Sequence, residues 1–339
     1  MNRETPQPPE KSICVLGGGA MGTACSIVLS EESTNAVRLW VRNPVFASHI
    51  AETRENTRLL PGIRIPQCVD VTSDASRAVI GADIILVCVP TRAIRDALNT
   101  MLEHIPASAL LVSAVKGIEV ETLVRPSEII QELLGSRSVV ALGGPCHAEE
   151  AATGKPTTVV AASADAAAAE IVQRTFSNRH FRVYSSPDLR GVELAGALKN
   201  VIAIAAGIGD GLDFGDNARS ALITRGLAEM VRFGTALGVN AQTFYGLAGI
   251  GDLIATCGSQ HSRNRRVGEL LGRGSTLPEI QNSTQAVAEG VYTAESIYAI
   301  AADKHIDMPI ARAVHDVLFD GKSPGRATEE LMQRPLKQE

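Results

Sequence analysis

The chain has 339 residues, of which 45% are hydrophobic and 20% charged, and its formal net charge is −5 at pH 7. This length suits about two domains, and this composition is typical of a globular protein with a sizeable core. The acidic net charge and the lack of a long basic run argue against nucleic acid as the main partner.

The amino-terminal segment and the cysteines bear on the cellular location of the protein. Residues 1–10, MNRETPQPPE, contain three prolines and almost no apolar residue, so we predict a disordered tail and no secretory signal. No segment is expected to span a bilayer, because the most apolar one, around Lys199, is expected to be too short and contains a charge. The six cysteines are scattered without CxxC pairs or metal-ligand spacing. These features predict a cytoplasmic protein without a metal.

Residues 11–186 alternate short β-branched runs with segments rich in alanine, leucine and charged residues. Near-continuous apolar strands separated by helices indicate a parallel sheet covered on both faces. We therefore predict an α/β domain that is a doubly wound, Rossmann-type, mostly parallel sheet. The expected strands are ICVLG (13–17), AVRLWV (36–41), ADIILVCVP (82–90), ALLVSAV (109–115), SVVALGGP (138–145), TTVVAAS (157–163) and FRVYSS (181–186).

The strand signals end near Pro187, and residues 187–339 are predicted to form a second, all-helical domain. Within 217–238, Leu222, Leu227 and Met230 fall near one helical face, and Gly238 is expected to follow the helix end. The sequence therefore predicts a sheet domain followed by a helical domain.

A glycine-rich turn follows the first expected strand. Gly17, Gly19 and Gly22 form a G-x-G-x-x-G pattern between that strand and a helix. Such glycines permit a tight turn and the close approach of a pyrophosphate, whose charge the helix N-terminus favours. We predict dinucleotide binding; the alternatives are a plain glycine turn or a related fold that binds another nucleotide.

The end of the second strand bears on the choice of cofactor. NAD-specific sites usually offer an acid about 20 residues after the glycines, to bind the ribose hydroxyls. Here the sequence has Arg42 and Asn43 instead. An arginine suits a 2′-phosphate, so NADP or NAD is expected as cofactor, with NADPH favoured; the alternative is a solvated surface arginine.

Two lysines stand out. Lys116 directly follows an expected strand, where its amine would project toward the carboxyl ends of the sheet. Lys199 lies in the apolar run LAGALKNVIAIAAGIG (194–209), where an unpaired charge would be costly to bury. Each lysine alone could be solvated, but two lysines expected at one site indicate that the site is functional.

At this point the chain resembles a known family, the NAD(P)-dependent glycerol-3-phosphate dehydrogenases in their bacterial form. The matching segments keep the family's order and spacing from Ile13 to about Leu331. They are LPGI (60–63), KGIE (116–119), GGPCHAEE (143–150), VELAGALKNVIAIAAGIGDGL (192–212), NARSALITRGLAEM (217–230), GLAGIGDLIATC (246–257), SRNRRVG (262–268) and VAEGVYTA (287–294).

The resemblance implies reversible hydride transfer between NAD(P)H and dihydroxyacetone phosphate, giving sn-glycerol 3-phosphate for phospholipid synthesis. Oxidation of the C2 hydroxyl needs a base near neutral pH, below lysine's usual pKa of ~10.4. Lys199 matches the family's general acid/base, and burial with a second lysine would lower its pKa. The family also implies a homodimer.

The remaining site residues are carried over from the family. Asp252 matches a carboxylate that could hold a lysine amine, with Thr256 one turn further on. Arg263 and Asn264, beside Ser262, match a phosphate site, where an arginine fork suits the dianion. Arg265 and Arg266 are expected to be surface charges. The full expected sets are, for substrate, Lys116, Gly144, Cys146, Lys199, Asp252, Ser262, Arg263 and Asn264, and, for cofactor, Gly17, Gly19, Ala20, Met21, Gly22, Arg42, Lys116, Ala148, Arg263, Val287 and Glu289.

The chain departs from the family pattern at two places. Cys146 and His147 follow Gly144-Pro145 where a hydroxyl residue and an aromatic are common, and a thiol is the poorer hydrogen-bond partner. Met21 stands where an aromatic is frequent. We expect a lower substrate affinity from the first departure, unless the backbone makes that contact, and little loss from the second.

Two other functions are compatible with parts of the sequence. One is a related dehydrogenase acting on a 3-hydroxyacyl or 6-phosphogluconate substrate, against which Arg263, Asn264 and the GIGDL segment argue. The other is a nucleotide-sensing protein without catalysis, against which the two lysines and Asp252 argue.

Overall fold

The computed structural model describes residues 11–31, 34–283, 288–336 and 338, and the chain divides into two compact units. The first comprises Met1–Val115, Ser127–Leu142 and Cys146–Leu189. The second comprises Lys116–Pro126, Gly143–Pro145 and Arg190–Glu339. Two short segments that follow strands of the first unit therefore belong to the second, and they carry Lys116 and Gly144.

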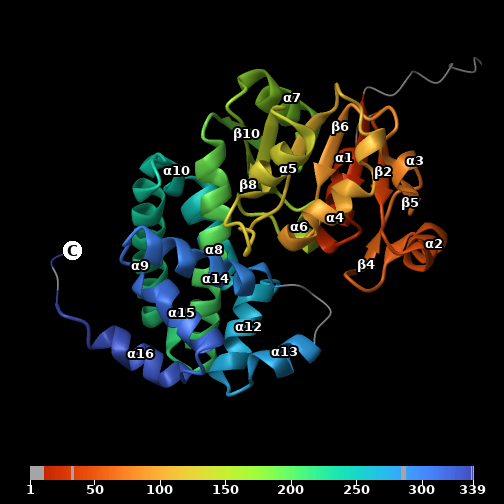
Figure 1. Ribbon diagram of the computed structural model, residues 1–339. Helices are drawn as coiled ribbons and strands as arrows, with labels where there is room; N and C mark the ends of the chain where they lie inside the picture. Colours follow the sequence, from red (N-terminus) through yellow and green to blue (C-terminus); the bar gives the residue numbers. More distant parts are fainter. Residues whose placement is uncertain (1–10, 32–33, 284–287, 337, 339) are drawn as a thin grey trace, which may run out of the picture. The chain divides into compact units, whose positions relative to one another are not determined.

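The first unit is built on an eight-stranded sheet (Figure 1). Its strand order is β10-β9-β8-β7-β6-β1-β2-β5, and β1 pairs in parallel with both β2 and β6. The pairs β2–β5, β6–β7, β7–β8 and β9–β10 are also parallel. The strands are β1 (Ser12–Leu16), β2 (Ala36–Trp40), β5 (Asp70–Thr72), β6 (Ile84–Val87), β7 (Leu110–Ser113), β8 (Val139–Gly143), β9 (Thr157–Ala162) and β10 (Phe181–Ser186).

The apolar runs explain the centre of this sheet. The four residues of β6 and the five of β8 are all buried, as expected for strands covered on both faces. All seven predicted strands form, which confirms the predicted fold class. The sequence pattern missed β5 at the sheet edge and the small hairpin of β3 (Glu55–Asn56) and β4 (Leu60–Arg64). β3 and β5 are too short to give a periodic signal, and Pro61 and Gly62 interrupt the pattern of β4.

Helices cover the sheet between its strands. α1 contacts β1 and β2 and packs beside α6 and α7, while α3 contacts β1, β2 and β5. Three of these helices begin at a side-chain cap, for example Asn43, which accepts the Phe46 N–H at the start of α2. The helices are α1 (Ala20–Ser30), α2 (Pro44–Thr53), α3 (Ala75–Val79), α4 (Ile94–Asn99), α5 (Pro126–Leu134), α6 (Ala148–Ala151) and α7 (Ala166–Phe176).

The second unit is helical, as predicted. Its helices are α8 (Leu189–Gly211), α9 (Gly215–Ala236), α10 (Ala241–Phe244), α11 (Asp252–Gly258), α12 (Arg263–Gly272), α13 (Leu277–Ser283), α14 (Glu289–Asp303), α15 (Pro309–Phe319) and α16 (Pro324–Met332). Gly238 follows α9 with a φ of 77°, the left-handed conformation that ends helices.

The expectation that the apolar segment around Lys199 is too short to span a bilayer is wrong. This helix spans 23 residues with a mean hydropathy of 1.5, so by length and composition it could cross a membrane. However, 94% of that apolar window is buried inside the protein. A helix that is apolar on all sides is also what the core of a large helical unit requires, and α8 occupies that place here.

Glycines let α8 and α12 approach closely. A Cβ at Gly207 would collide with the Arg265 carbonyl oxygen, and one at Gly268 would collide with the Ile204 carbonyl oxygen. About one turn further along each helix, Gly211 on α8 and Gly272 on α12 lie against each other. The backbones are therefore in direct contact, which fixes α12 relative to the last turns of α8.

Candidate active site

The amine of Lys199 lies at the centre of a polar cluster within the second unit. Lys199 comes from the middle of α8 and is 6% exposed. Its Nζ donates to Asp252 Oδ1 at 3.0 Å and to Thr256 Oγ1 at 2.7 Å. The lysine therefore does not extend to solvent; its charge is paired inside the protein.

Lys116 reaches the same carboxylate from a different segment. Its Nζ donates to Asp252 Oδ2 at 2.7 Å and to the Gly144 carbonyl at 2.9 Å. Gly144 has a φ of 108°, which disfavours any residue with a Cβ. One carboxylate thus joins two lysines, one oxygen to each.

A distorted helical turn positions Asp252. Leu247–Gly251 forms a π-helical turn directly before α11, and Asp252 is the first residue of α11. A Cβ at Gly249 would collide with the Phe244 backbone, so the close turn requires glycine there. π-turns of this kind are frequent at functional sites because they redirect the side chains that follow. Thr256 lies one turn further along α11 and donates to Asp252 Oδ1 at 3.2 Å.

Burial and charge set the ionisation of the cluster. Burial lowers the pKa of Lys199 to about 8; Asp252 opposes this shift and the Lys116 ammonium adds to it. Burial by itself would raise the pKa of Asp252, but the ammonium groups of Lys116 and Lys199 outweigh it and hold that pKa below its ordinary value. The result is an amine that can exchange a proton near neutral pH beside a carboxylate that stays ionised.

The first turn of α12 carries the three residues expected to bind phosphate. Ser262 caps the helix, accepting the Arg265 N–H at 3.2 Å. Asn264 is buried; its Nδ2 donates to Asn200 Oδ1, and its Oδ1 accepts the Gly290 N–H. Arg263 is exposed, and the described part of the chain gives it no ion pair. Backbone N–H groups at this helix N-terminus and the Arg263 guanidinium are therefore available to an anion.

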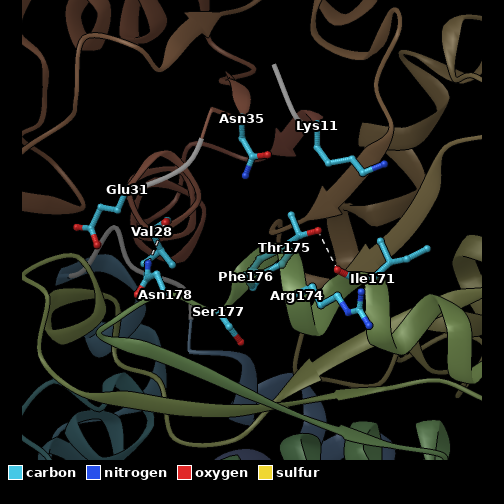
Figure 2. A pocket seen from close by; sticks show the side chains of 10 residues that line it. All are labelled: Lys11, Val28, Glu31, Asn35, Ile171, Arg174, Thr175, Phe176, Ser177 and Asn178. Carbon is cyan, nitrogen blue, oxygen red and sulfur yellow. Dashed lines mark hydrogen bonds between the residues drawn. The ribbon is translucent and has the colours of Figure 1, made fainter. Parts of the chain in front are cut away.

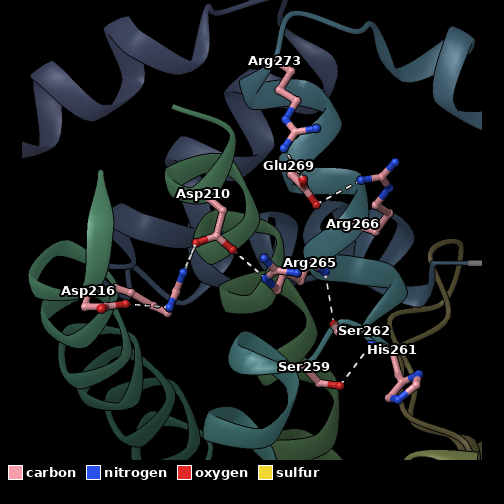
Figure 3. A network of polar contacts seen from close by, with 10 residues as sticks. Asp210, Asp216, Ser259, His261, Ser262, Arg265, Arg266, Glu269 and Arg273 are labelled. Carbon is pink, nitrogen blue, oxygen red and sulfur yellow. Dashed lines mark hydrogen bonds and ion pairs between the residues drawn. The ribbon is translucent and has the colours of Figure 1, made fainter. Parts of the chain in front are cut away.

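The expectation that Arg265 is a surface charge is wrong. Its Nε donates to Asp210 Oδ2 at 2.6 Å (Figure 3). Arg219 donates to the other oxygen of the same carboxylate at 2.6 Å. Asp210, near the end of α8, is largely buried. Arg265 therefore ties the first turn of α12 to α8. Arg266 is exposed, as expected, and pairs with Glu269.

The glycine turn of the first unit fits a dinucleotide. Gly17 has a φ of 125°, and a Cβ at Gly22 would collide with the Gly17 carbonyl oxygen, so the fold itself requires these two glycines. Gly19 differs: its φ is −77°, and a Cβ there would meet nothing closer than 4.0 Å. No side chain caps α1, so the N–H groups of its first turn, at Ala20, Met21 and Gly22, point to the space in front of Gly19. This is a cradle for a pyrophosphate.

The other expected residues of the first unit lie as follows. Arg42 follows β2, is exposed, and has no ion pair or hydrogen bond among the described residues. Cys146 is half-buried, with its Sγ 4.0 Å from Met21 Sδ, and Ala148 begins α6. The thiol at 146 thus contacts the glycine turn of its own unit.

Of the two expected cofactor residues near α14, one can be described. Val287 lies outside the described residues. Glu289 is half-buried and begins α14. The structure therefore places Glu289 beside Gly290, the residue whose N–H meets Asn264.

Sequence reasoning missed Asn200 as a site residue. It lies next to Lys199 on α8, is 4% exposed, and donates from Nδ2 to the Lys116 carbonyl at 3.1 Å. The signal was present, because a carboxamide inside a long apolar run needs a partner as much as an amine does.

A cavity elsewhere in the first unit is not this site. It has a volume of about 350 Å³, and Figure 2 shows its walls at the end of α1 and along the second half of α7. Lys11 and Arg174 line it, and Arg174 pairs with Glu170. None of the residues expected to bind substrate or cofactor lies in its wall.

One group of potential metal ligands also lies apart from this site. Among the described residues, His315, Asp316 and Asp320 bring one ligand atom each within 4.8 Å of one another. Lys322 already pairs with Asp316 at 2.7 Å. The Lys322 ammonium therefore already neutralises part of the negative charge that a metal ion would bind.

The chain has a parallel sheet with a glycine turn after its first strand, followed by a helical unit that holds a buried lysine pair. These features define the class of two-domain, Rossmann-type oxidoreductases that use a nicotinamide cofactor.

The comparisons with known proteins identify the family within this class. Residues 12–169 match the family model described as NAD-dependent glycerol-3-phosphate dehydrogenase N-terminus, and residues 188–329 match the corresponding C-terminus. The glycerol-3-phosphate dehydrogenase [NAD(P)+] of Bacillus velezensis is 47% identical over 327 residues, 96% of this chain and 94% of that protein. The chain belongs to this family.

Further relatives agree. The Geobacillus thermodenitrificans protein of the same name is 47% identical over 332 residues, covering 97% of this chain and 96% of its own. The crystal structure of glycerol-3-phosphate dehydrogenase from Coxiella burnetii superimposes with a TM-score of 0.92 at 35% identity, covering 96% of this chain and all of that one. The family resemblance therefore extends over nearly the whole chain.

Proposed function

We propose that this protein catalyses reversible hydride transfer between NAD(P)H and dihydroxyacetone phosphate, giving sn-glycerol 3-phosphate. The family supports this proposal, as do relatives named glycerol-3-phosphate dehydrogenase [NAD(P)+] that match this chain over nearly their full length. The observation that carries the chemistry is the buried Lys199 amine, paired with Asp252 and with a pKa of about 8.

Lys199 acts as the general acid and base. An ammonium has three N–H bonds; two are taken by Asp252 and Thr256, and the described residues give the third no partner. In reduction, this N–H donates its proton to the substrate oxygen at C2 as the alkoxide forms. In oxidation, the neutral amine takes the proton from the C2 hydroxyl.

Asp252 and Lys116 keep Lys199 ready for this exchange. The carboxylate holds both amines and keeps the Lys199 ammonium from losing its proton too easily. The Lys116 ammonium has the opposite effect to that of the carboxylate, because its positive charge lowers the pKa of Lys199. Lys116 also offers its own free N–H to the substrate, together with the backbone around Gly144 and Cys146.

The substrate phosphate binds at the N-terminus of α12. Arg263 supplies a guanidinium fork, and the backbone N–H groups and the Ser262 hydroxyl supply further donors. Because Asn264 already binds Asn200 and Gly290, only its second Nδ2 proton can face the phosphate.

The cofactor binds on the glycine turn, at Gly17, Gly19, Ala20, Met21 and Gly22, and supplies or accepts the hydride when bound. Arg42 favours NADPH by pairing with its 2′-phosphate. From the family we carry over further contacts at Lys116, Ala148, Arg263, Val287 and Glu289. In this scheme residues 11–186 supply most of the contacts to the dinucleotide, and residues 187–339 supply most of the contacts to the substrate.

The test is oxidation of NADPH, and separately of NADH, by the purified protein with dihydroxyacetone phosphate. Turnover that needs the substrate phosphate is expected, with NADPH preferred. Turnover of 6-phosphogluconate in its place would assign another substrate, and cofactor binding without any turnover would indicate a sensor.

Assembly and location complete the proposal. We expect a homodimer, which light scattering of the purified protein tests against a monomer. We also expect a cytoplasmic protein that provides glycerol 3-phosphate for phospholipids, which fractionation of the source cells and the lipid content of a deletion strain test.

A further inference from the structure

Asn200 joins the backbone of Lys116 to two other elements of the second unit. Its Nδ2 donates to the Lys116 carbonyl at 3.1 Å, and its Oδ1 accepts from Asn264 Nδ2 at 2.9 Å. Asn264 Oδ1 in turn accepts the Gly290 N–H at 2.9 Å. Three hydrogen bonds therefore run from the start of α14, through α12 and α8, to Lys116.

The chemistry of the end groups fixes the direction of this relay. A backbone N–H can only donate, so the oxygen of Asn264 must face Gly290. A backbone carbonyl can only accept, so the NH₂ group of Asn200 must face Lys116. Neither carboxamide can be turned over without losing a bond, which makes the assigned orientations unambiguous.

The relay lies in a closely packed, buried setting. Asn200 is 4% exposed and Asn264 8%. A Cβ at Gly290 would come within 2.8 Å of both the Asn200 carbonyl oxygen and Asn264 Oδ1. Unpaired carboxamides in such a place would cost free energy, so the arrangement has little freedom to move.

Lys116 is held at both ends in consequence. Asn200 holds its carbonyl, while Gly144 and Asp252 hold its ammonium. Its stem passes over Gly196, where a Cβ would lie 3.4 Å from Lys116 Cγ. Gly196 and Asn200 are four residues apart on one face of α8, and Lys199 lies on the same side, so one helix surface places both lysines.

We propose that Asn200 is a positioning residue that acts through Lys116: the relay from Gly290 holds Lys116 against Asp252 and thereby sets the proton affinity of Lys199. This inference rests on the proposed function for its catalytic meaning. Without Asn200, Lys116 is free to withdraw from Asp252. Lys199 then loses a neighbouring positive charge and gains a larger share of the carboxylate, and both changes favour its protonated form.

The first experiment measures Lys199 directly, without turnover. The chain has seven lysines, so protein labelled with ¹³C at lysine Cε gives a simple NMR spectrum whose shifts follow each amine as pH rises. We expect the Asn200→Ala variant to titrate at Lys199 about half to one pH unit above the wild type. An unchanged titration in a folded variant would overturn the proposal.

The second experiment is a double-mutant cycle on the rate of dihydroxyacetone phosphate reduction. Asn200→Ala is expected to lower kcat about tenfold with little change in cofactor affinity. In a Lys116→Ala background, the same substitution should add less than about twofold, because the residue through which it acts is gone. A full tenfold further loss there would show that Asn200 acts by another route.

Two further variants test whether a shift in the Lys199 titration comes only from a general loss of folded structure. Ser26→Ala removes a buried hydroxyl whose one hydrogen bond among the described residues is to the Thr23 carbonyl of its own helix, and it should leave the Lys199 titration unchanged. Should Asn200→Ala fail to fold, Asn200→Ser keeps a polar atom yet is too short to bridge Lys116 and Asn264, and the same shift is expected. If the wild type has no turnover but the titration shifts, the proposed function fails and the positioning role stands.

Discussion

The glycine turn before α1 and the lysine cluster around Asp252 are built in opposite ways. In the turn, the backbone N–H groups proposed to bind the pyrophosphate all lie within six residues of Gly17, and Trp40 and Asn56 only support the turn from behind through its backbone. In the cluster, Lys116 and Asp252 are 136 residues apart and meet only after the second unit has folded. The first site is a property of a short segment, and the second is a property of the packed unit.

This difference predicts how each site fails. A local cradle loses ligand affinity when its surface is changed but leaves the rest of the molecule unaffected. A buried charge cluster is coupled, so a change at one group alters the ionisation of the others. The variants below test that contrast.

The largest effect is expected from Lys199→Ala. It removes the proposed general acid and base, so turnover of dihydroxyacetone phosphate should fall by about 10³-fold or more. Cofactor affinity, measured by fluorescence titration, should stay within about twofold because the glycine turn is untouched. Lys304→Ala, at an exposed lysine after α14, is the matched control and should keep its activity. A near-normal rate for Lys199→Ala would remove Lys199 from its role.

The coupling within the cluster is tested by pH. Because the pKa of Lys199 is about 8, reduction, which needs the ammonium, should decline as pH rises through 8. Oxidation, which needs the neutral amine, should increase over the same range. Asp252 raises the pKa of Lys199, so Asp252→Asn should move both transitions to lower pH and cut the rate about 10²-fold. Profiles of kcat/KM from pH 6 to 10 measure this, and transitions that stay in place would contradict the coupling.

The local site is tested by a pair of glycine variants. Gly19→Ala should weaken NADPH binding about tenfold while leaving the melting temperature nearly unchanged, since its backbone is ordinary and its Cβ would face open space. Gly22→Ala should lower the melting temperature, because its Cβ would collide with Gly17. Equal melting temperatures for the two variants would contradict this division of roles.

The smallest effect is expected from Arg42→Ala. It should weaken NADPH by roughly tenfold or less and leave NADH within about twofold, because only NADPH carries the 2′-phosphate. Arg64→Ala, at another exposed arginine of the same unit, serves as control. Equal losses for both cofactors would show that Arg42 does not bind that phosphate.

Local patterns in the sequence were enough to predict the strands, the glycine turn and one helix end. Apolar runs predicted the seven long strands, the glycine spacing predicted the turn before α1, and Gly238 predicted the end of α9. Each follows from backbone geometry and side-chain periodicity over a few residues. The same locality explains the omissions, since β3 and β5 have too few residues for a period to appear, and Pro61 and Gly62 interrupt the pattern of β4.

The tertiary structure alone decided which groups meet and how they ionise. It joined Lys199 and Lys116 through one carboxylate, set the pKa of Lys199 near 8 by burial, and drew Arg265 into a pair with Asp210. It also connected Asn200 and Asn264 between three helices. These outcomes depend on close packing between distant segments, at glycines such as Gly207 and Gly268, and no short stretch of sequence contains that information.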